Sequence, residues 1–178
     1  MIQKVTKYKY EGIAYDSFSQ LKQAYPYISF PAGAADDVLL TLGIEKVDEY
    51  PPLERCKDIM RTQAGMLFAH KRDAIRWVEF GSKKYGFDCA SEDITNFMAA
   101  YTPLFVVGKG TVFYKVWLSE TEKGIVEITA EEMTNVYNAV RTGQMEAYVW
   151  YDKTKKGINA AETVEELNKI ELVEELNV

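Results

Sequence analysis

The most constraining stretch of the sequence runs from Ile125 to Leu167, where a short strand leads into two helical segments. Residues 125–128 are rich in β-branched side chains and favour a strand. Thr129 and Glu132 have the T-x-x-E spacing of a capping box, in which each side chain accepts a hydrogen bond from an unpaired N–H at the start of a helix. Apolar residues then recur at helical spacing. They are Met133, Val136, Tyr137, Val140, Ala147, Tyr148 and Tyr151.

Gly143 leaves the length of this helix open. Glycine costs about 1 kcal/mol inside a helix and is also a common end signal, so the residues alone allow either a continuous helix or a break. Thr163 and Glu166 repeat the capping spacing. This predicts a second, shorter helix close to the end of the sequence.

The frame Ile-Thr-Ala-Glu-Glu-Met at 128–133, followed by a helix and by Lys-Lys-Gly-Ile-Asn-Ala-Ala-Glu-Thr-Val-Glu-Glu-Leu at 155–167, carries a resemblance. It resembles the C-terminal half of an uncharacterised domain common in phage tail and tail-fibre-associated proteins. The likeness extends over roughly residues 70–172. It includes two further matches, Phe113-Tyr-Lys-Val-Trp117 and Tyr85-Gly-Phe-Asp88 followed by Ser91-Glu-Asp-Ile94. The resemblance implies one continuous helix from about 130 to 156 and brings no catalytic residues with it.

The first fifty residues predict a small α+β module. We expect strands at 2–10 and 13–15, a helix capped by Asp16 or Ser17 and ended by Pro26, and an extended segment at 28–31. A second helix should start near Ala35 and stop at Gly43, before a strand at 44–47. The run from Tyr15 to Ile44, above all Tyr-Pro-Tyr-Ile-Ser-Phe-Pro at 25–31, is similar to the N-terminal module of many phage tail-fibre assembly proteins.

After Pro51-Pro52, the clearest break, the pattern predicts a larger domain. A long helix from about Leu53 to Ile75 precedes a hairpin at 77–87 and a helix capped by Ser91 and ended by Pro103. Residues 105–118 are strand-rich, with a turn at 108–110, and a turn at 122–124 leads into 125–128. The predicted fold is α+β, with a module at 1–50 and a domain of short antiparallel hairpins packed on two long helices at 53–178, ending in a capped helix.

Composition narrows the function classes. The 178-residue chain has a net charge of −6, which disfavours a nucleic-acid partner. It shows no signal peptide and no apolar run near eighteen residues, so we expect no membrane partner and synthesis in a cytoplasm. Two cysteines without C-x-x-C spacing and a single histidine predict no disulfide framework, no metal site and no cofactor.

Candidate catalytic groups have simpler structural interpretations. Gly108-Lys109-Gly110-Thr111 lacks the first glycine of a phosphate-binding loop and is interpreted as a tight hairpin turn. His70 with Cys56 or Cys89 could form a nucleophilic pair, although nothing in the sequence places them together. Nearly all clustered carboxylates fall in first helical turns, where anions stabilise the helix N-terminus.

Candidate interface residues are aromatic or acidic. Trp77, Trp117, Tyr148 and Trp150 could anchor an interface, although core packing is an equally simple explanation. The acidic end at 162–175, with Glu165 and Glu166, fits a solvated helix face or a contact with a basic partner.

The function that follows from the two resemblances is a non-enzymatic phage tail protein. It would lie at the baseplate or tail-fibre attachment of the virion, after assembly in the host cytoplasm, and bind other tail, baseplate or tail-fibre proteins or a second copy of itself. One alternative is a tail-fibre assembly chaperone that is absent from the mature virion. Another is a small hydrolase that uses a cysteine or a carboxylate pair.

Overall fold

The computed structural model describes residues 1–30 and 36–172, and it confirms the predicted α+β class. Pro31, the expected helix start near Ala35 and the acidic residues Glu174 and Glu175 lie outside the described residues. The chain forms two compact units. Unit 1 contains Met1–Ile59 and Ala160–Ile170, and unit 2 contains Met60–Asn159 and, among the described residues, Glu171 and Leu172. This division differs from the one expected at Pro51-Pro52, since the border falls within a helix and a later segment joins unit 1.

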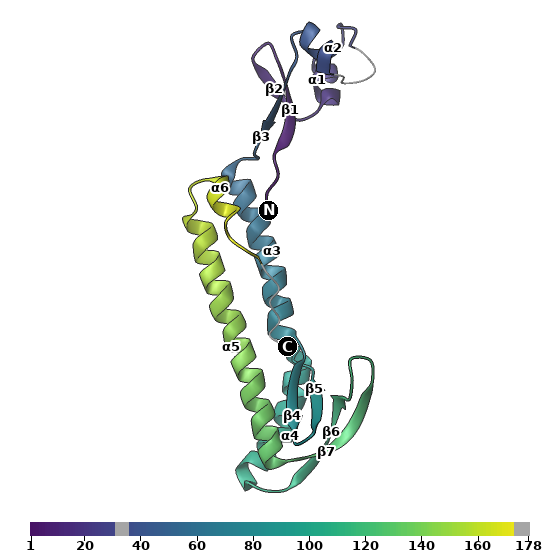
Figure 1. The fold of residues 1–178 in the computed structure, drawn as a ribbon, viewed down its shortest axis with the longest axis vertical. Coiled ribbons are helices and arrows are strands. Elements are labelled where there is room, and N and C mark those ends of the chain that lie inside the picture. Colours follow the sequence, from purple (N-terminus) through teal and green to yellow (C-terminus); the bar gives the residue numbers. More distant parts are fainter. Residues whose placement is uncertain (31–35, 173–178) are drawn as a thin grey trace. The chain divides into compact units, whose positions relative to one another are not determined.

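Unit 1 is built on a three-stranded antiparallel sheet with the strand order β2-β1-β3 (Figure 1). The strands are β1 (Val5–Tyr10), β2 (Ile13–Tyr15) and β3 (Glu45–Glu49). The β1–β2 turn is made by Glu11 and Gly12, both at positive φ, a conformation that suits glycine and strains glutamate. The predicted hairpin and returning strand are therefore confirmed.

Two short helices cover this sheet, and the core of unit 1 lies between them and the strands. Helix α1 (Phe18–Ala24) is capped by Ser17, whose side chain accepts a hydrogen bond from Gln20 N–H, and it is followed by α2 (Asp36–Thr41). One buried leucine from each helix and Ile44 before β3 meet aromatic rings from the strands, from α1 and from the segment after α1. The core residues are Leu21, Leu39 and Ile44, packed against Tyr8, Tyr10, Tyr15, Phe18 and Phe30.

Helix α6 (Val164–Leu167) belongs to unit 1. Asn168 next to it accepts a hydrogen bond from Ile2 N–H at 2.6 Å and donates one to Ile2 O at 3.2 Å. Thr163 caps α6 as predicted, but the Glu166 carboxylate accepts from Glu162 N–H instead of completing a reciprocal capping box.

Two long helices, α3 (Leu53–Asp73) and α5 (Ala130–Ala160), run side by side over the residues that belong to unit 2, 60–73 and 130–159 (Figure 1). Phe68 of α3 stacks on Tyr151 of α5 with ring centroids 4.6 Å apart. Helix α5 continues through Gly143, and its capping box is confirmed: Thr129 N–H donates to the Glu132 carboxylate at 2.8 Å, and Glu132 N–H donates to Thr129 Oγ1 at 3.2 Å.

The sheet of unit 2 has the order β4-β5-β6-β7, all antiparallel. Its strands are β4 (Arg76–Phe80), β5 (Lys83–Phe87), β6 (Thr111–Trp117) and β7 (Lys123–Thr129). One face packs on α5 and on α4 (Ser91–Val107). The buried core is Phe87, Cys89, Phe97, Tyr101, Leu104, Val116, Ile128, Met133, Val136 and Val140.

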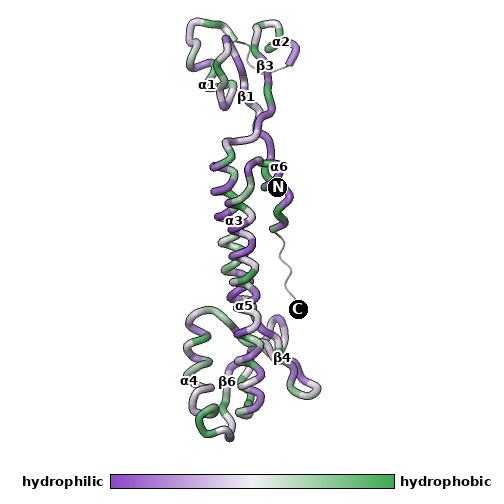
Figure 2. Tube along the Cα trace, turned by 90° about the vertical axis from the view of Figure 1, so that its left-hand side faces the viewer, coloured by the Kyte–Doolittle hydropathy of each residue, from purple (hydrophilic) through white to green (hydrophobic). Residues whose placement is uncertain are grey.

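Helix α4 corrects three predictions. Ser91 is its first residue rather than its cap, since Ala90 precedes it without a side-chain cap. Pro103 lies inside the helix, because Tyr101 and Leu104 on either side are buried in the core and this packing outweighs one lost backbone hydrogen bond. The helix continues to Val107 through a strongly hydrophobic stretch, visible in Figure 2, that had been expected to begin a strand.

The segment 108–110 is also not a hairpin turn. Gly108 adopts the left-handed conformation at φ 72° and ends α4, its N–H donating to Leu104 O at 2.8 Å. The chain then passes directly into β6. The glycines were interpreted correctly as turn residues, but the element before them was misassigned.

Candidate protein-interaction surface

One face of the unit 2 sheet is open to solvent and carries large apolar side chains among charged ones. Side chains alternate between the two faces of a strand, and along β6 and β7 the even-numbered residues point into the core. The odd-numbered ones point outward, and Phe113 and Ile125 among them are 73% and 72% exposed. We call Trp77, Phe113, Trp117 and Ile125 the open face, because all four project from this side of the sheet.

A glycine brings the two tryptophans of the open face together. Trp77 of β4 is opposite Gly86 of β5, and Gly86 is opposite Trp117 of β6. A Cβ at position 86 would lie 3.2 Å from Trp77 Cδ2 and 3.0 Å from Trp117 Cβ. Both indole groups are half-buried. Because Gly86 has no side chain, the two tryptophans can lie on either side of it in one row across three strands.

Asp88 fixes the orientation of Trp117. Its carboxylate accepts a hydrogen bond from Trp117 Nε1 at 2.8 Å and pairs with Lys123 Nζ at 2.6 Å. The Lys123 ammonium also lies 4.2 Å from the centre of the Trp117 ring, within cation–π range. A rigid aromatic anchor loses little entropy when it binds a partner, so this triad is well suited to an interface.

A second group of exposed apolar side chains lies on α5, where the Tyr148 ring also packs against Phe68 of α3 with centroids 5.1 Å apart. Met145, Tyr148 and Val149 are all more than half exposed. Trp150 is half-buried, with Lys71 Nζ 5.3 Å from the centre of its ring. Two shallow grooves follow this side of the helix, and their linings combine apolar and charged side chains. The lining residues are Asn138, Arg141, Thr142, Met145, Glu146, Tyr148, Val149, Trp150, Asp152, Lys153 and Lys156.

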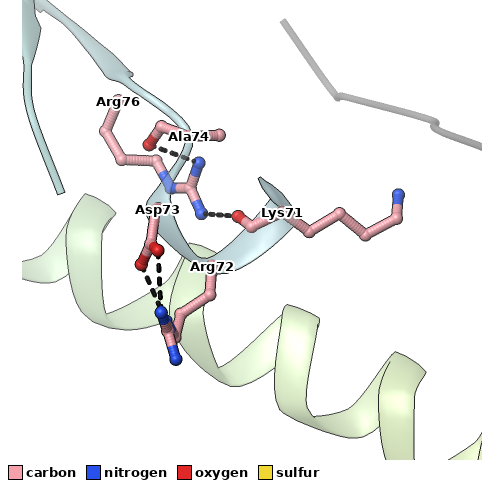
Figure 3. A network of polar contacts seen from close by, with 5 residues as sticks. All are labelled: Lys71, Arg72, Asp73, Ala74 and Arg76. Carbon is pink, nitrogen blue, oxygen red and sulfur yellow. Dashed lines mark hydrogen bonds and ion pairs between the residues drawn. The ribbon is translucent and has the colours of Figure 1, made fainter. Parts of the chain in front are cut away.

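Arg76 ties the end of α3 to the start of β4, the strand that carries Trp77. Its guanidinium donates to Lys71 O at 2.7 Å and to Ala74 O at 2.9 Å, which satisfies carbonyl groups at the helix C-terminus (Figure 3). Beside it, Arg72 and Asp73 form a two-pronged ion pair with both contacts at 2.7 Å. This polar network fixes the connection between α3 and β4, the strand that carries Trp77.

The structure brings some of the predicted interface residues together and separates others. Trp77 and Trp117 are neighbours across Gly86, and Tyr148 and Trp150 lie on α5. Glu165 and Glu166 are exposed on α6, in the other unit, and Glu166 serves its own helix start. Trp77, Trp117 and Trp150 are half-buried, so only Tyr148 of the aromatic four is largely exposed.

Sequence reasoning missed Phe113 and Ile125, the most exposed apolar side chains of the open face. Apolar residues occur at even and at odd positions of β6 and β7, although Lys115, Lys123 and Glu127 also occupy odd positions. The available signal was the parity of Val112, Val116 and Ile128, which fixes the core side and leaves Phe113 and Ile125 on the other.

The thiols are placed for packing. Cys89 is buried in the core, where its Sγ donates to Phe87 O at 3.3 Å, and burial raises the pKa of its thiol to about 11. Burial also raises the pKa of Cys56, in unit 1. A nucleophilic cysteine needs a lowered pKa, so neither environment activates the thiol. His70 is exposed near the end of α3.

In residues 1–30 and 36–172, no cluster of three metal-ligating side chains occurs. No helix in the same ranges combines the length and the apolar character required to cross a bilayer. Comparison of the chain with known protein families, with curated proteins and with solved structures gives no match.

Proposed function

We propose that the chain is a non-enzymatic structural protein of a bacteriophage tail, located at the baseplate or tail-fibre attachment and acting through protein–protein contacts. The observation that carries the binding role is the open face. Phe113 and Ile125 are largely exposed beside two tryptophans whose positions are fixed by Gly86 and Asp88. Exposed apolar patches of this kind mark interaction sites, and tryptophan is enriched among the residues that dominate binding energy.

The chemical character of the surface supports protein contacts over other ligands. The open face is a sheet surface rather than a cavity, whereas small-molecule sites are concave and enclose most of the ligand. Protein interfaces combine aromatic residues with polar and charged ones, and the open face does the same, since Lys115 lies opposite Ile125 and Glu127 lies opposite Phe113. The assignment to a phage tail rests on the sequence resemblances over residues 15–44 and 70–172 alone.

Mass spectrometry of purified, intact virions tests this proposal. A tail component is expected in the particles at a copy number that matches a tail ring or fibre attachment. Absence from intact virions, together with presence in infected-cell lysate, would contradict the structural role and favour the assembly chaperone. A pull-down with the C-terminal tip of the tail fibre would then distinguish a chaperone from a protein with no part in the tail.

A further inference from the structure

Strand β7 forms one edge of the unit 2 sheet. The alternation of its hydrogen bonds to β6 shows which of its backbone groups point away from the sheet. In an antiparallel ladder, residue pairs that exchange hydrogen bonds alternate with pairs that do not. Ala130 N–H donates to Gly110 O at 3.1 Å, and the β6–β7 register continues this pairing to Tyr114 and Val126. The bonded pairs are therefore the even-numbered ones. The N–H and C=O groups of odd-numbered residues in β7 point away from β6.

Thr129 supports this direction independently. Its N–H donates a hydrogen bond to the Glu132 carboxylate at 2.8 Å rather than to β6. In the described part of the chain, no strand lies on the outer side of β7 (Figure 1). Lys123, Ile125 and Glu127 thus present three outward N–H groups and three outward C=O groups, a template for a further strand.

We propose that β7 pairs antiparallel with β7 of a second copy of this chain, with Ile125 opposite Ile125. This register matches outward backbone groups on both strands, so that Ile125 pairs with its counterpart and Lys123 pairs with Glu127 of the second copy. The two-fold symmetry repeats the Lys123–Glu127 pair, as in any isologous contact. Two opposite-charge pairs therefore flank one apolar pair.

The neighbouring registers fit less well. Centring the pair on Glu127 places two carboxylates directly opposite each other, which is destabilising. Centring it on Val126 sets Lys123 against Thr129, whose N–H is already bound by Glu132. Charged residues on edge strands ordinarily prevent such pairing. Here they favour a single register, because the charges at 123 and 127 have opposite signs.

The pairing also extends the open face. Side chains of the odd-numbered residues in β7 lie on the same side of the sheet as Phe113. In the proposed dimer, the two Ile125 side chains meet at the centre, Lys115 lies opposite each of them on β6, and Phe113 is a diagonal neighbour of each. The result is an eight-stranded sheet in which the open faces of the two copies are joined along β7. This inference rests on the geometry of β7 and does not depend on the phage-tail assignment.

Cysteine cross-linking tests the register. In the full-length protein, Ile125→Cys should form an intermolecular disulfide under mild oxidation, because bonded antiparallel pairs have Cα atoms about 5.5 Å apart. Phe113→Cys is the matched control, since Phe113 and Ile125 are 73% and 72% exposed on the same face. The two 113 positions would be three strand spacings apart across the sheet and four residues apart along it, roughly 20 Å in all, too far for a disulfide. Cys56 and Cys89 are buried at 0% and 1% exposure and should not react.

Sedimentation velocity over a concentration series gives the second readout. The unmodified chain is expected to dimerise, and Glu127→Lys to weaken dimerisation by about tenfold, because two attractive pairs become repulsive. Glu120→Lys makes the same charge change in the β6–β7 loop and should leave dimerisation unchanged. A chain that stays monomeric at all concentrations, or equal cross-linking of the two cysteine variants, would overturn the proposal.

Discussion

The guanidinium of Arg76 lies directly over Gly143, so that a Cβ at position 143 would fall 2.1 Å from Arg76 Nε and 2.6 Å from Cζ. This contact accounts for a glycine in the middle of a 31-residue helix. Arg76 occupies that space because it bonds two carbonyl groups at the end of α3. Gly143 is thus a packing residue, and the helix tolerates its poor propensity in exchange for the close approach.

Gly143→Ala should therefore destabilise the protein, although alanine favours a helix by about 1 kcal/mol over glycine. We expect a net loss of about 1–2 kcal/mol in the free energy of unfolding, since overpacking of this kind costs about 1–3 kcal/mol. Urea denaturation measures the loss. In an Arg76→Ala background the clash is gone, and the same substitution should become stabilising.

Gly65→Ala is the matched control for that experiment. Gly65 lies inside α3, and a Cβ there would meet only the Tyr151 hydroxyl at 3.9 Å, an ordinary contact. The substitution should stabilise the protein by up to about 1 kcal/mol. If both glycine variants were equally stabilising, the contact between Arg76 and Gly143 would not constrain the helix.

The two glycines also show where sequence reasoning stops. The capping box at Thr129 and Glu132 and the helical spacing after it were sufficient to place the start of α5, because both signals are local. Whether Gly143 breaks the helix depends on Arg76, which is distant in sequence, so local propensity left it open. The prediction that Pro103 ends α4 was wrong for the same reason, because burial of Tyr101 and Leu104 outweighs the local preference to end the helix.

The candidate surface was only partly predictable. Aromatic content pointed to Trp77 and Trp117 but not to their meeting across Gly86, which requires the register of three strands. Phe113 and Ile125 could not be separated from core residues by composition, because apolar residues occur on both faces of β6 and β7. Only the packing of α4 and α5 against one face decides which side stays open.

Removing the Asp88 carboxylate should loosen Trp117. Asp88→Ala loses the bond from Trp117 Nε1 and the pair with Lys123, and we expect a cost of about 1–2 kcal/mol in unfolding free energy. Asp88→Asn keeps an acceptor for the indole and should cost about half as much. Denaturant unfolding gives both values, and acrylamide quenching of tryptophan fluorescence should increase for Asp88→Ala. Equal stability of both variants and the parent would argue against a positioned Trp117.

Stability should fall in alkaline solution because of two buried acids. Burial raises the pKa of the Cys89 thiol from 9.0 to about 11, and burial with nearby carboxylates raises the pKa of Tyr114 from 10.0 to about 12. Each group stays protonated in the folded chain while the unfolded chain loses the proton. Their contribution is complete below about pH 9 and disappears as the pH rises through 11 and 12.

Cys89→Ala isolates the thiol's share of that effect. The variant should lose the part of the decline between pH 9 and 11, about 2 kcal/mol, and keep the part above pH 10 that comes from Tyr114. Chemical denaturation at fixed pH values measures both curves. The native parent should also react slowly with a thiol reagent at pH 8. Identical pH profiles for parent and variant would contradict a buried, protonated Cys89.

The central claim is that the open face binds other tail proteins, and incorporation into virions tests it most directly. The measurement is quantitative mass spectrometry of particles assembled with the parent chain or with Phe113→Ser/Ile125→Ser. These side chains are 73% and 72% exposed, so unfolding free energy should change by no more than about 0.5 kcal/mol per site. We predict that the parent is present in the particles and that the folded double variant falls at least tenfold. Equal incorporation of both chains, or absence of the parent from intact virions, would contradict the claim.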